Sequence, residues 1–298
     1  MSRRIVAVLA ASFAVVCGAA AFVWLHAGGQ NKAVVHFTPD PPAARASVAP
    51  EPAATPAEKN PPAAGSEGNP AASVAALEPG FAPVNGEVLQ FSGSVAKVNN
   101  VASLRLVVTG RKEIAGKDAW HLQAFAHTQN PLRMVFELDD QFDSYSAAGD
   151  FNSVQYEMRL SERGQKVQSI QRMTTTGRLA APAGTIAAMV LPGTRDPLGM
   201  MQYLRSVDWT KTPVVHGPVY DGRKLYEVRA QKIGLAEVEV PAGKYSTSTV
   251  DIKVFDNGVE MKDAHFTLYL AKDAARTPVL LEAVLPFAAA RVELMKKQ

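Results

Sequence analysis

The stretch 220–231, YDGRKLYEVRAQ, decides the fold class of this 298-residue chain. It opens on Asp221-Gly222, a turn signal, because glycine adopts backbone conformations that other residues avoid. From residue 226 onward, apolar side chains alternate with charged or amide side chains over six positions. Alternation of this kind places one set of side chains on each face of a β-sheet. The stretch therefore predicts a strand with one buried face.

The same two-residue period recurs on both sides of this stretch. It is seen in residues 103–108, 121–127 and 265–270. Turn signals separate the periodic runs at Glu162-Arg163-Gly164, Pro241-Ala242-Gly243 and Asp256-Asn257-Gly258. Short periodic runs with frequent turns are typical of antiparallel all-β domains. We expect a curved antiparallel sheet or open barrel of about ten strands, with one or two short helices.

The best helix signal begins at Asp196, a good N-cap residue, followed by Pro197 at the first helical position. We expect this helix to run to about Val207. Just upstream, residues 179–191 are unusually apolar for a connection. A long strand, a second short helix or a hydrophobic flap would each explain them, because periodicity does not separate these alternatives in a short apolar run.

The N-terminus carries a basic pair followed by an uncharged apolar run over residues 5–25. A helix of that length spans about 30 Å, which matches the hydrocarbon core of a bilayer. We expect residues 1–29 to be an uncleaved signal anchor, placing a single-pass protein in the inner membrane with its C-terminal domain in the periplasm. The alternatives are a signal peptide cleaved before Phe22, which would give a secreted periplasmic protein, and lipidation of Cys17.

Residues 30–83 are rich in Pro and Ala, and eleven of the twenty prolines fall between residues 37 and 83. Proline lacks an amide donor and alanine offers little apolar area, so this composition does not build a core. We expect a disordered linker here, and an extracytoplasmic β domain over residues 84–298. Cys17 is the single cysteine of the chain, which leaves the domain without an internal disulfide.

Charge is nearly balanced, with 31 basic and 28 acidic residues that are interspersed along the chain. Nucleic-acid binding requires a basic patch or stripe, so a nucleic-acid partner is not expected. The sequence holds no nucleotide, serine-hydrolase or zinc-protease motif. We therefore expect no cofactor, no metal and no recognisable catalytic residue. The question of enzymatic activity stays open, leaning against it.

The histidines and the densest acidic group have structural interpretations. His121 and His127 fall on one side of one predicted strand, but six residues separate them by about 20 Å, too far for one metal ion. The acidic group of Asp139, Asp140 and Asp143 lacks the ordered oxygen ligands and the bend glycine of a calcium loop. We expect it to be a solvated turn.

Several methionine and aromatic residues gather around the predicted helix. Core packing and an adaptable apolar pocket both explain them, since the flexible thioether of methionine suits variable ligands. The candidate ligand-binding residues are Trp120, Met189, Met200, Met201, Tyr203, Leu204 and Trp209.

The second half of the chain resembles a bacterial exported-protein family catalogued as domain of unknown function 3108. The matching stretches are Asp196-Pro197-Leu198 and residues 220–226, 237–245, 268–273 and 276–279. The resemblance covers residues 86–294 and is firmest after Asp196. It implies a secreted or envelope-attached β domain, and it implies no catalytic residue.

Three functional hypotheses follow, in decreasing order of preference. The first is a non-enzymatic cell-envelope module, tethered to the inner membrane through residues 5–25, that binds a lipid, another apolar ligand or an envelope protein. The second is a structural or assembly protein that acts through protein–protein contacts. The third is a hydrolase without a recognisable motif, which would place a serine or aspartate within hydrogen-bond reach of a histidine.

Overall fold

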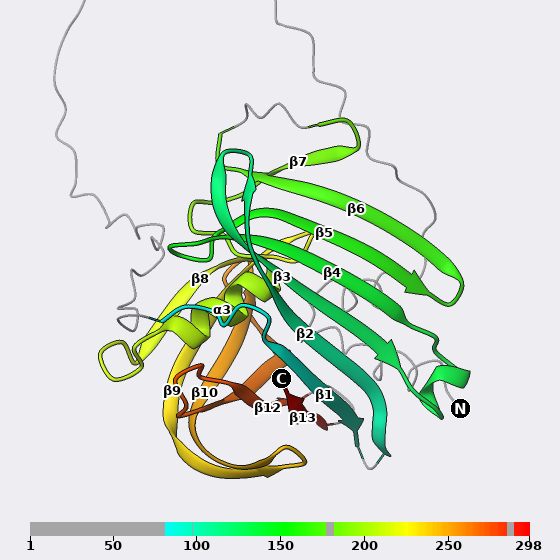
Figure 1. Ribbon diagram of the computed structural model, residues 1–298, viewed down its shortest axis with the longest axis vertical. Helices are drawn as coiled ribbons and strands as arrows, with labels where there is room; N and C mark the ends of the chain where they lie inside the picture. The colour runs from blue at the N-terminus through cyan, green and yellow to red at the C-terminus, as the bar shows by residue number, and fades with distance from the viewer. Residues whose placement is uncertain (1–80, 97, 177–181, 285–288) are drawn as a thin grey trace, which may run out of the picture.

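The computed structural model describes residues 81–96, 98–176, 182–284 and 289–298. These residues contain thirteen strands, one α-helix and one short 3-10 helix. All thirteen strands belong to one sheet, in the order β7-β6-β5-β4-β3-β2-β1-β13-β12-β11-β10-β9-β8. Each pair of neighbours is antiparallel except β6 and β7, which are parallel. The expected all-β class and curved, open antiparallel sheet are confirmed (Figure 1).

The first half of the sheet runs outward from its centre to one edge. Its elements are, in chain order, β1 (Val88–Val95), β2 (Val98–Ile114), β3 (Lys117–Thr128), the 3-10 helix η1 (Leu132–Met134), β4 (Asp139–Ala147), β5 (Ser153–Glu162), β6 (Gln165–Thr174) and β7 (Thr185–Met189).

The second half begins at the opposite edge and returns to the centre. Its elements are the helix α3 (Pro197–Ser206), β8 (Val214–Tyr220), β9 (Leu225–Val240), β10 (Gly243–Asp256), β11 (Val259–Ala271), β12 (Pro278–Val284) and β13 (Ala289–Lys297). The last strand, β13, pairs with the first strand, β1, so the two halves join at the centre of the sheet.

A short extended segment before the helix joins the two halves a second time. The amide of Ser153, at the start of β5, donates to the carbonyl of Thr194 over 3.0 Å. The amide of Arg195 donates to Pro218 of β8 over 3.0 Å, and the carbonyl of Arg195 accepts from Tyr220 over 2.9 Å. These bonds link β5 to β8, so the sheet curls toward a closed, barrel-like shape.

The helix α3 lies inside this curl, between β8 and the strands β3 and β4 (Figure 1). It begins at the expected position, because Asp196 caps it and Pro197 occupies its first turn. Gly199 allows close packing: a Cβ atom at this position would lie 2.7 Å from Ser146 Oγ and 2.8 Å from the Phe151 carbonyl. Eight of its ten residues are buried, so the helix forms part of the core.

The hairpin of β9 and β10 folds back over the far end of the second half. Val238 and Val240, near its tip, are buried, and the amide of Ala242 donates to the carbonyl of Leu294 over 3.0 Å. A bulge in β9 permits this bend, because the register with β10 skips Ile233. The hairpin therefore covers one end of the core.

Three sequence expectations need correction or completion. The sheet has thirteen strands rather than about ten. The apolar stretch 179–191 contains the short strand β7, while residues 177–181 lie outside the described residues. Asp139, Asp140 and Asp143 lie in β4 and do not form a solvated turn. In that acidic run, Phe142 supplies the buried side chain that holds the strand to the core.

The predicted signal anchor and the predicted linker, residues 1–29 and 30–83, fall almost wholly outside the described residues. Within the described part of the chain, no helix is long and apolar enough to cross a membrane.

Candidate functional site

A groove with a volume of about 520 Å³ lies at the bulge of β9 and the end of β11. We call it the β9–β11 groove. Small-molecule sites typically occupy about 300–1,000 Å³. The groove is lined by Trp209, Thr210, Lys232, Leu235, Ser248, Leu270, Ala271, Lys272, Asp273, Ala274 and Arg276.

The apolar part of the groove comes from three separate segments. Leu270 of β11 and Trp209 of the α3–β8 connection are buried, and the indole Nε1 of Trp209 donates to the carbonyl of Leu204 over 3.0 Å. Leu235 of β9 is 61% exposed. Because its ring nitrogen already has a partner inside the protein, Trp209 offers the groove an apolar surface.

The bulge at Ile233 explains how residues from both sides of the β9 alternation line the same groove. Lys232 continues the apolar side of the β9 alternation, whereas Leu235 lies on its polar side. The extra residue in β9 rotates the strand locally, so both residues line the groove. A lysine on the apolar face, followed by a leucine on the polar face, is the signal in the sequence that marks this site.

The acidic residues near the groove already have cationic or hydroxyl partners. Asp273 accepts from the amide of Thr277 over 2.9 Å, from its hydroxyl over 2.6 Å and from Lys297 Nζ over 3.1 Å. Burial alone would raise the pKa of Asp273, but these hydrogen bonds outweigh it and lower the pKa below its ordinary value. Asp208 pairs with Lys211 over 2.8 Å.

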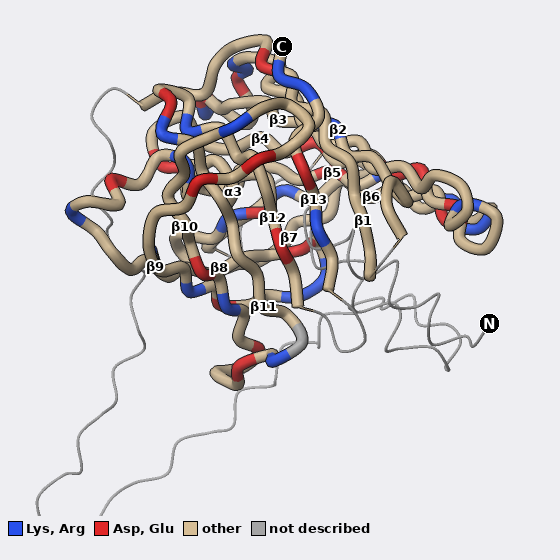
Figure 2. Tube along the Cα trace, turned by 90° about the horizontal axis from the view of Figure 1, so that it is seen from below, with Lys and Arg blue, Asp and Glu red and all other residues tan. Residues whose placement is uncertain are grey.

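The basic residues of the groove differ in whether their side chains have hydrogen-bond or ion-pair partners. The guanidinium of Arg276 donates to the carbonyls of Arg205 and Val207. Lys232 and Lys272 form no ion pair with any described residue. Figure 2 shows that acidic and basic residues are interspersed along the strands.

A second groove, of about 490 Å³, lies over β1, β2 and β3 near the end of β13. Arg105 lies over the ring of Phe125, with its Cζ atom 4.5 Å from the ring centroid. The groove is lined by Gln90, Phe91, Ser92, Asn100, Ser103, Leu104, Arg105, Phe125, His127, Gln129 and Met295. The guanidinium covers one face of the aromatic ring, but the exposed lining of this groove is mainly apolar.

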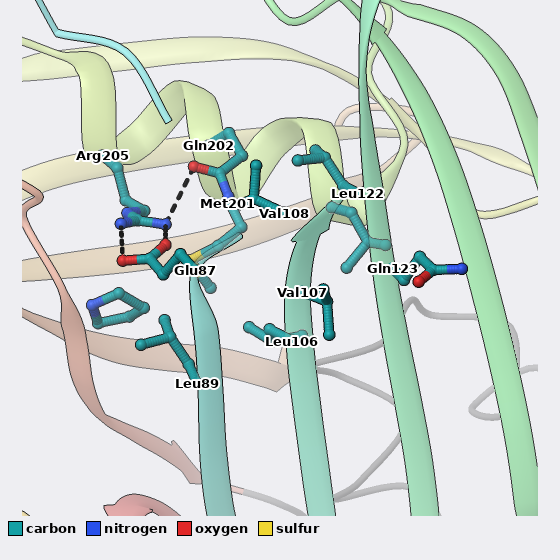
Figure 3. A pocket seen from close by; sticks show the side chains of 12 residues that line it. Glu87, Leu89, Leu106, Val107, Val108, Leu122, Gln123, Met201, Gln202 and Arg205 are labelled. Carbon is teal, nitrogen blue, oxygen red and sulfur yellow. Dashed lines mark hydrogen bonds and ion pairs between the residues drawn. The ribbon is translucent and has the colours of Figure 1, made fainter. Parts of the chain in front are cut away.

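A small cavity lies between α3 and the strands β1, β2 and β3 (Figure 3). Its volume of about 20 Å³ holds one water molecule, because a water site needs at least about 10–15 Å³. Met201 lies at this cavity beside the ion pair between Arg205 and Glu87. The cavity is therefore too small for an acyl chain.

The structure separates the seven candidate ligand-binding residues. Five of them are buried in the core, namely Trp120, Met200, Tyr203, Leu204 and Trp209. Met201 is half-buried and lines the small cavity, whereas Met189 is 76% exposed on the edge strand β7. Trp209 is the member of the set that lines the β9–β11 groove. Lys232 and Leu235 also line this groove and were not predicted, because the methionine and aromatic residues that suggest a pocket lie around the helix.

A polar network lies on β3, β4 and β5. Asp143 is buried and accepts from Gln123 over 2.7 Å; its Oδ1 atom also lies 2.7 Å from His121 Nε2, and Arg159 contacts Oδ2. Burial would raise the pKa of Asp143, but these hydrogen bonds outweigh it and hold the pKa well below its usual range. The ring of His121 stacks on Tyr145, with 4.5 Å between centroids.

The same network bears on hydrolytic chemistry. A histidine that activates a nucleophile needs a hydroxyl or thiol within hydrogen-bond reach of its free ring nitrogen. The Nδ1 atom of His121 has no hydrogen-bond partner among the described residues. His127 and His265 likewise contact aspartates, Asp139 and Asp251. These pairs lie across neighbouring strands, as expected for sheet-stabilising contacts.

No group of three or more His, Cys, Asp or Glu side chains suited to a metal ion occurs in the part of the chain that the structure describes.

Asp140 is a buried acid on β4 whose raised pKa makes the stability of the protein depend on pH. Burial raises its pKa to about 7, and the neighbouring Glu162 adds to the rise. The folded state therefore keeps a proton that the unfolded chain releases near pH 4. Because the folded state binds more protons between about pH 4 and pH 7, stability falls as the pH rises through this range.

Asp140→Asn is expected to stabilise the protein at pH 8 by on the order of 2 kcal/mol and to leave stability nearly unchanged at pH 4, because asparagine cannot ionise. Urea unfolding at both pH values measures the effect. Asp139→Asn is the matched control of opposite sign, since Arg133 lowers the pKa of Asp139 and so makes its ionised form stabilising. A loss of stability at pH 8 in Asp140→Asn would contradict the assignment.

Comparisons with solved structures give similar chains of low identity. A β-barrel-like protein of domain of unknown function DUF1849 from Brucella abortus is 10% identical, with a TM-score of 0.47, covering 72% of this chain and 98% of its own. A hypothetical protein from Chlamydia trachomatis is 6% identical, with a TM-score of 0.34, covering 72% of this chain and 88% of its own. No curated protein matches the chain.

The family comparison covers most of the β domain. The model of the family described as "Protein of unknown function (DUF3108)" matches residues 90–295. This range runs from β1 to β13 and includes α3 and both halves of the sheet. It agrees with the resemblance seen in the sequence over residues 86–294. The chain therefore belongs to the DUF3108 family.

Proposed function

We propose that this protein is a non-enzymatic cell-envelope module, tethered to the inner membrane through residues 5–25, whose β domain binds a lipid-like amphiphile. The observation that carries the proposal is the β9–β11 groove, which combines a volume of about 520 Å³ with an exposed leucine and a tryptophan. An apolar lining with a few polar groups is the usual composition of a small-molecule site.

The location of the apolar surface favours the groove over the helix region. Leu235 is 61% exposed, so a bound acyl chain would remove apolar area from water at this residue. The cavity at Met201 holds only about 20 Å³ and is nearly filled by side chains. We therefore assign the ligand to the groove, where Trp209 is both a predicted ligand-binding residue and a lining residue.

A photoactivatable fatty acid tests the proposal. The full chain, in phosphatidylcholine nanodiscs, is irradiated with a palmitate analogue that carries a diazirine in its acyl chain, and labelled peptides are identified by mass spectrometry. We expect saturable labelling near Trp209, Leu235 and Leu270, suppressed by excess palmitate. Leu235→Asp is expected to weaken labelling about tenfold, since a buried leucine contact contributes about 1.5 kcal/mol.

Val259→Asp is the matched control for that change. Val259 is 70% exposed, lies on β11 in the same half of the sheet, and does not line the groove. It is expected to leave labelling unchanged. Labelling that does not saturate, or that falls equally in both variants, would rule out an amphiphile site in the groove.

An observation on β7 favours assembly through protein contacts as a second candidate. This strand pairs with β6 on one side and has no strand on the other side among the described residues. Ile186 and Met189 are exposed there, and an unpaired strand edge can accept a strand from another chain. Ile186→Lys is expected to abolish contacts made at this edge while groove labelling persists, since a charge on an edge strand opposes pairing.

A further inference from the structure

Two lysines of the β9–β11 groove have no ion-pair partner among the residues that the structure describes. Lys232 lies at the bulge of β9, and Lys272 directly follows β11. Both residues line the groove, and neither forms an ion pair with a described residue. An ammonium group over a partly apolar surface attracts an anion, because its field is less screened there than in bulk water.

Two acidic side chains near these lysines, Asp273 and Asp208, already form hydrogen bonds or ion pairs with other residues. Asp273 is held by Thr277 and Lys297, and Asp208 is held by Lys211 at 2.8 Å. Asp273 lines the groove together with Lys232, Lys272 and Arg276, so the lining carries one acidic and three basic side chains. The groove therefore keeps an excess of positive charge, although charges elsewhere along the strands are interspersed (Figure 2).

The positive and apolar parts of the groove lie next to each other. Leu235 follows Lys232 by three residues across the bulge, and Leu270 precedes Lys272 by two residues. Each lysine is thus near an apolar lining residue in the chain, one of them on β9 and the other directly after β11. A ligand that contacts both parts needs an anionic end joined directly to an apolar body.

We propose that the β9–β11 groove binds an amphiphile with one acyl chain and an anionic headgroup, with Lys232 and Lys272 contacting the headgroup. This inference rests on the proposed function and specifies the class of its ligand. The volume of about 520 Å³ lies in the middle of the range for a single small ligand, which favours one acyl chain over a two-chain lipid.

A headgroup series at constant chain length tests the inference. Palmitate, 1-hexadecanol and hexadecyltrimethylammonium compete against the diazirine fatty acid for the full chain in phosphatidylcholine nanodiscs. We expect palmitate to compete roughly five- to tenfold better than hexadecanol, and the cation to compete least. Raising the salt concentration from about 0.05 M to about 0.5 M should reduce the palmitate advantage, because salt screens partly exposed charge pairs.

The variant Lys232→Met/Lys272→Met removes both charges and keeps apolar side chains of similar length. It is expected to abolish the advantage of palmitate over hexadecanol while hexadecanol competes as before. The matched control is Lys117→Met/Lys166→Met, which removes two exposed lysines outside the groove. Comparing the two double variants cancels the partition of each competitor into the nanodisc.

The outcomes separate this inference from the proposed function. If neither palmitate nor hexadecanol suppresses groove labelling, the amphiphile site itself is absent. If both compete equally, or if the two double variants behave alike, the groove binds an acyl chain without reading its headgroup, and the inference is overturned. Thermal unfolding of each variant verifies that a loss of binding does not reflect a loss of fold.

Discussion

Glu87→Leu is expected to lower the free energy of unfolding by about 3–5 kcal/mol, because it leaves the buried guanidinium of Arg205 without a counter-charge. Arg205 and Glu87 are almost completely buried and form a two-pronged ion pair, with contacts of 2.8 and 3.0 Å. The guanidinium also donates to the Ala275 carbonyl over 3.1 and 2.8 Å, and to Gln202 over 3.1 Å. All five of its N–H donors are thereby used.

The consequences extend across three distant segments. The cluster ties the end of α3 to the residue before β1 (Figure 3), and the carbonyl of Ala275 ties it to the loop after β11. Urea unfolding followed by circular dichroism measures the loss of stability. The double variant Glu87→Leu/Arg205→Met is the control, and it is expected to recover most of the loss, because apolar pairs often replace buried ion pairs without cost.

The reverse single change should behave differently with pH. Arg205→Met leaves a buried carboxyl, which can take up a proton, whereas a guanidinium cannot escape its charge in this way. We therefore expect the destabilisation by Arg205→Met to shrink as the pH is lowered toward 5, while that of Glu87→Leu stays constant. Equal and pH-independent losses in both single variants would contradict the ion-pair account.

Asp196→Ala is expected to cost on the order of 3–5 kcal/mol, since it removes the helix cap and leaves two buried hydroxyl groups without their acceptor. One carboxylate oxygen accepts from the amides of Leu198 and Gly199, each over 2.9 Å. The other accepts from the hydroxyl of Ser144 over 2.6 Å and from that of Ser153. Asp196 thus fixes α3 to β4 and β5.

Asp196→Asn separates the cap from the charge. Asparagine caps helices as well as aspartate does, and its amide group can donate to the two serine hydroxyls in place of accepting from them. We expect it to recover at least half of the loss caused by alanine, as measured by the urea midpoint. If alanine and asparagine destabilise equally, the negative charge rather than the hydrogen-bond geometry holds the helix.

Local sequence patterns were sufficient to predict individual strands and the position of the helix. The alternation at Tyr226 and Val228 lies in β9, with both side chains buried, and the Asp196-Pro197 signal begins α3 as expected. Local patterns contain no information on which strands meet over long distances. The pairing of β1 with β13 joins residues such as Phe91 and Leu294, about 200 positions apart.

The acidic run in β4 is a place where composition alone predicts the wrong local structure. Three aspartates in five residues suggest a solvated turn, because isolated buried carboxylates are costly. Asp143 is nevertheless buried, since Arg159 and His121 of neighbouring strands complete its hydrogen bonds, together with the amide side chains of Gln123 on β3 and Gln141 on β4 itself. Those partners come from three different strands, so the compensation is invisible until the sheet is assembled.

The residues of the β9–β11 groove could be predicted only in part from the sequence. Trp209 belonged to the predicted ligand-binding set, whereas Lys232 and Leu235 did not. Each of them departs from the alternation of polar and apolar residues in β9. Such departures from a local pattern are expected at functional or strained positions. The bulge that brings them together follows from the register between β9 and β10, which only the paired strands define.

The pairing of β1 with β13 also sets the order in which the domain can form. The first strands are neighbours in the chain and can pair as soon as each is synthesised, whereas the partner on the other side of β1 arrives last. Contacts of such large sequence separation form slowly, because a long loop must be closed first. A ribosome-tethered chain lacking residues 289–298 should therefore leave β1 unpaired on one side, and a chaperone that shields this strand edge would prevent premature association with other chains.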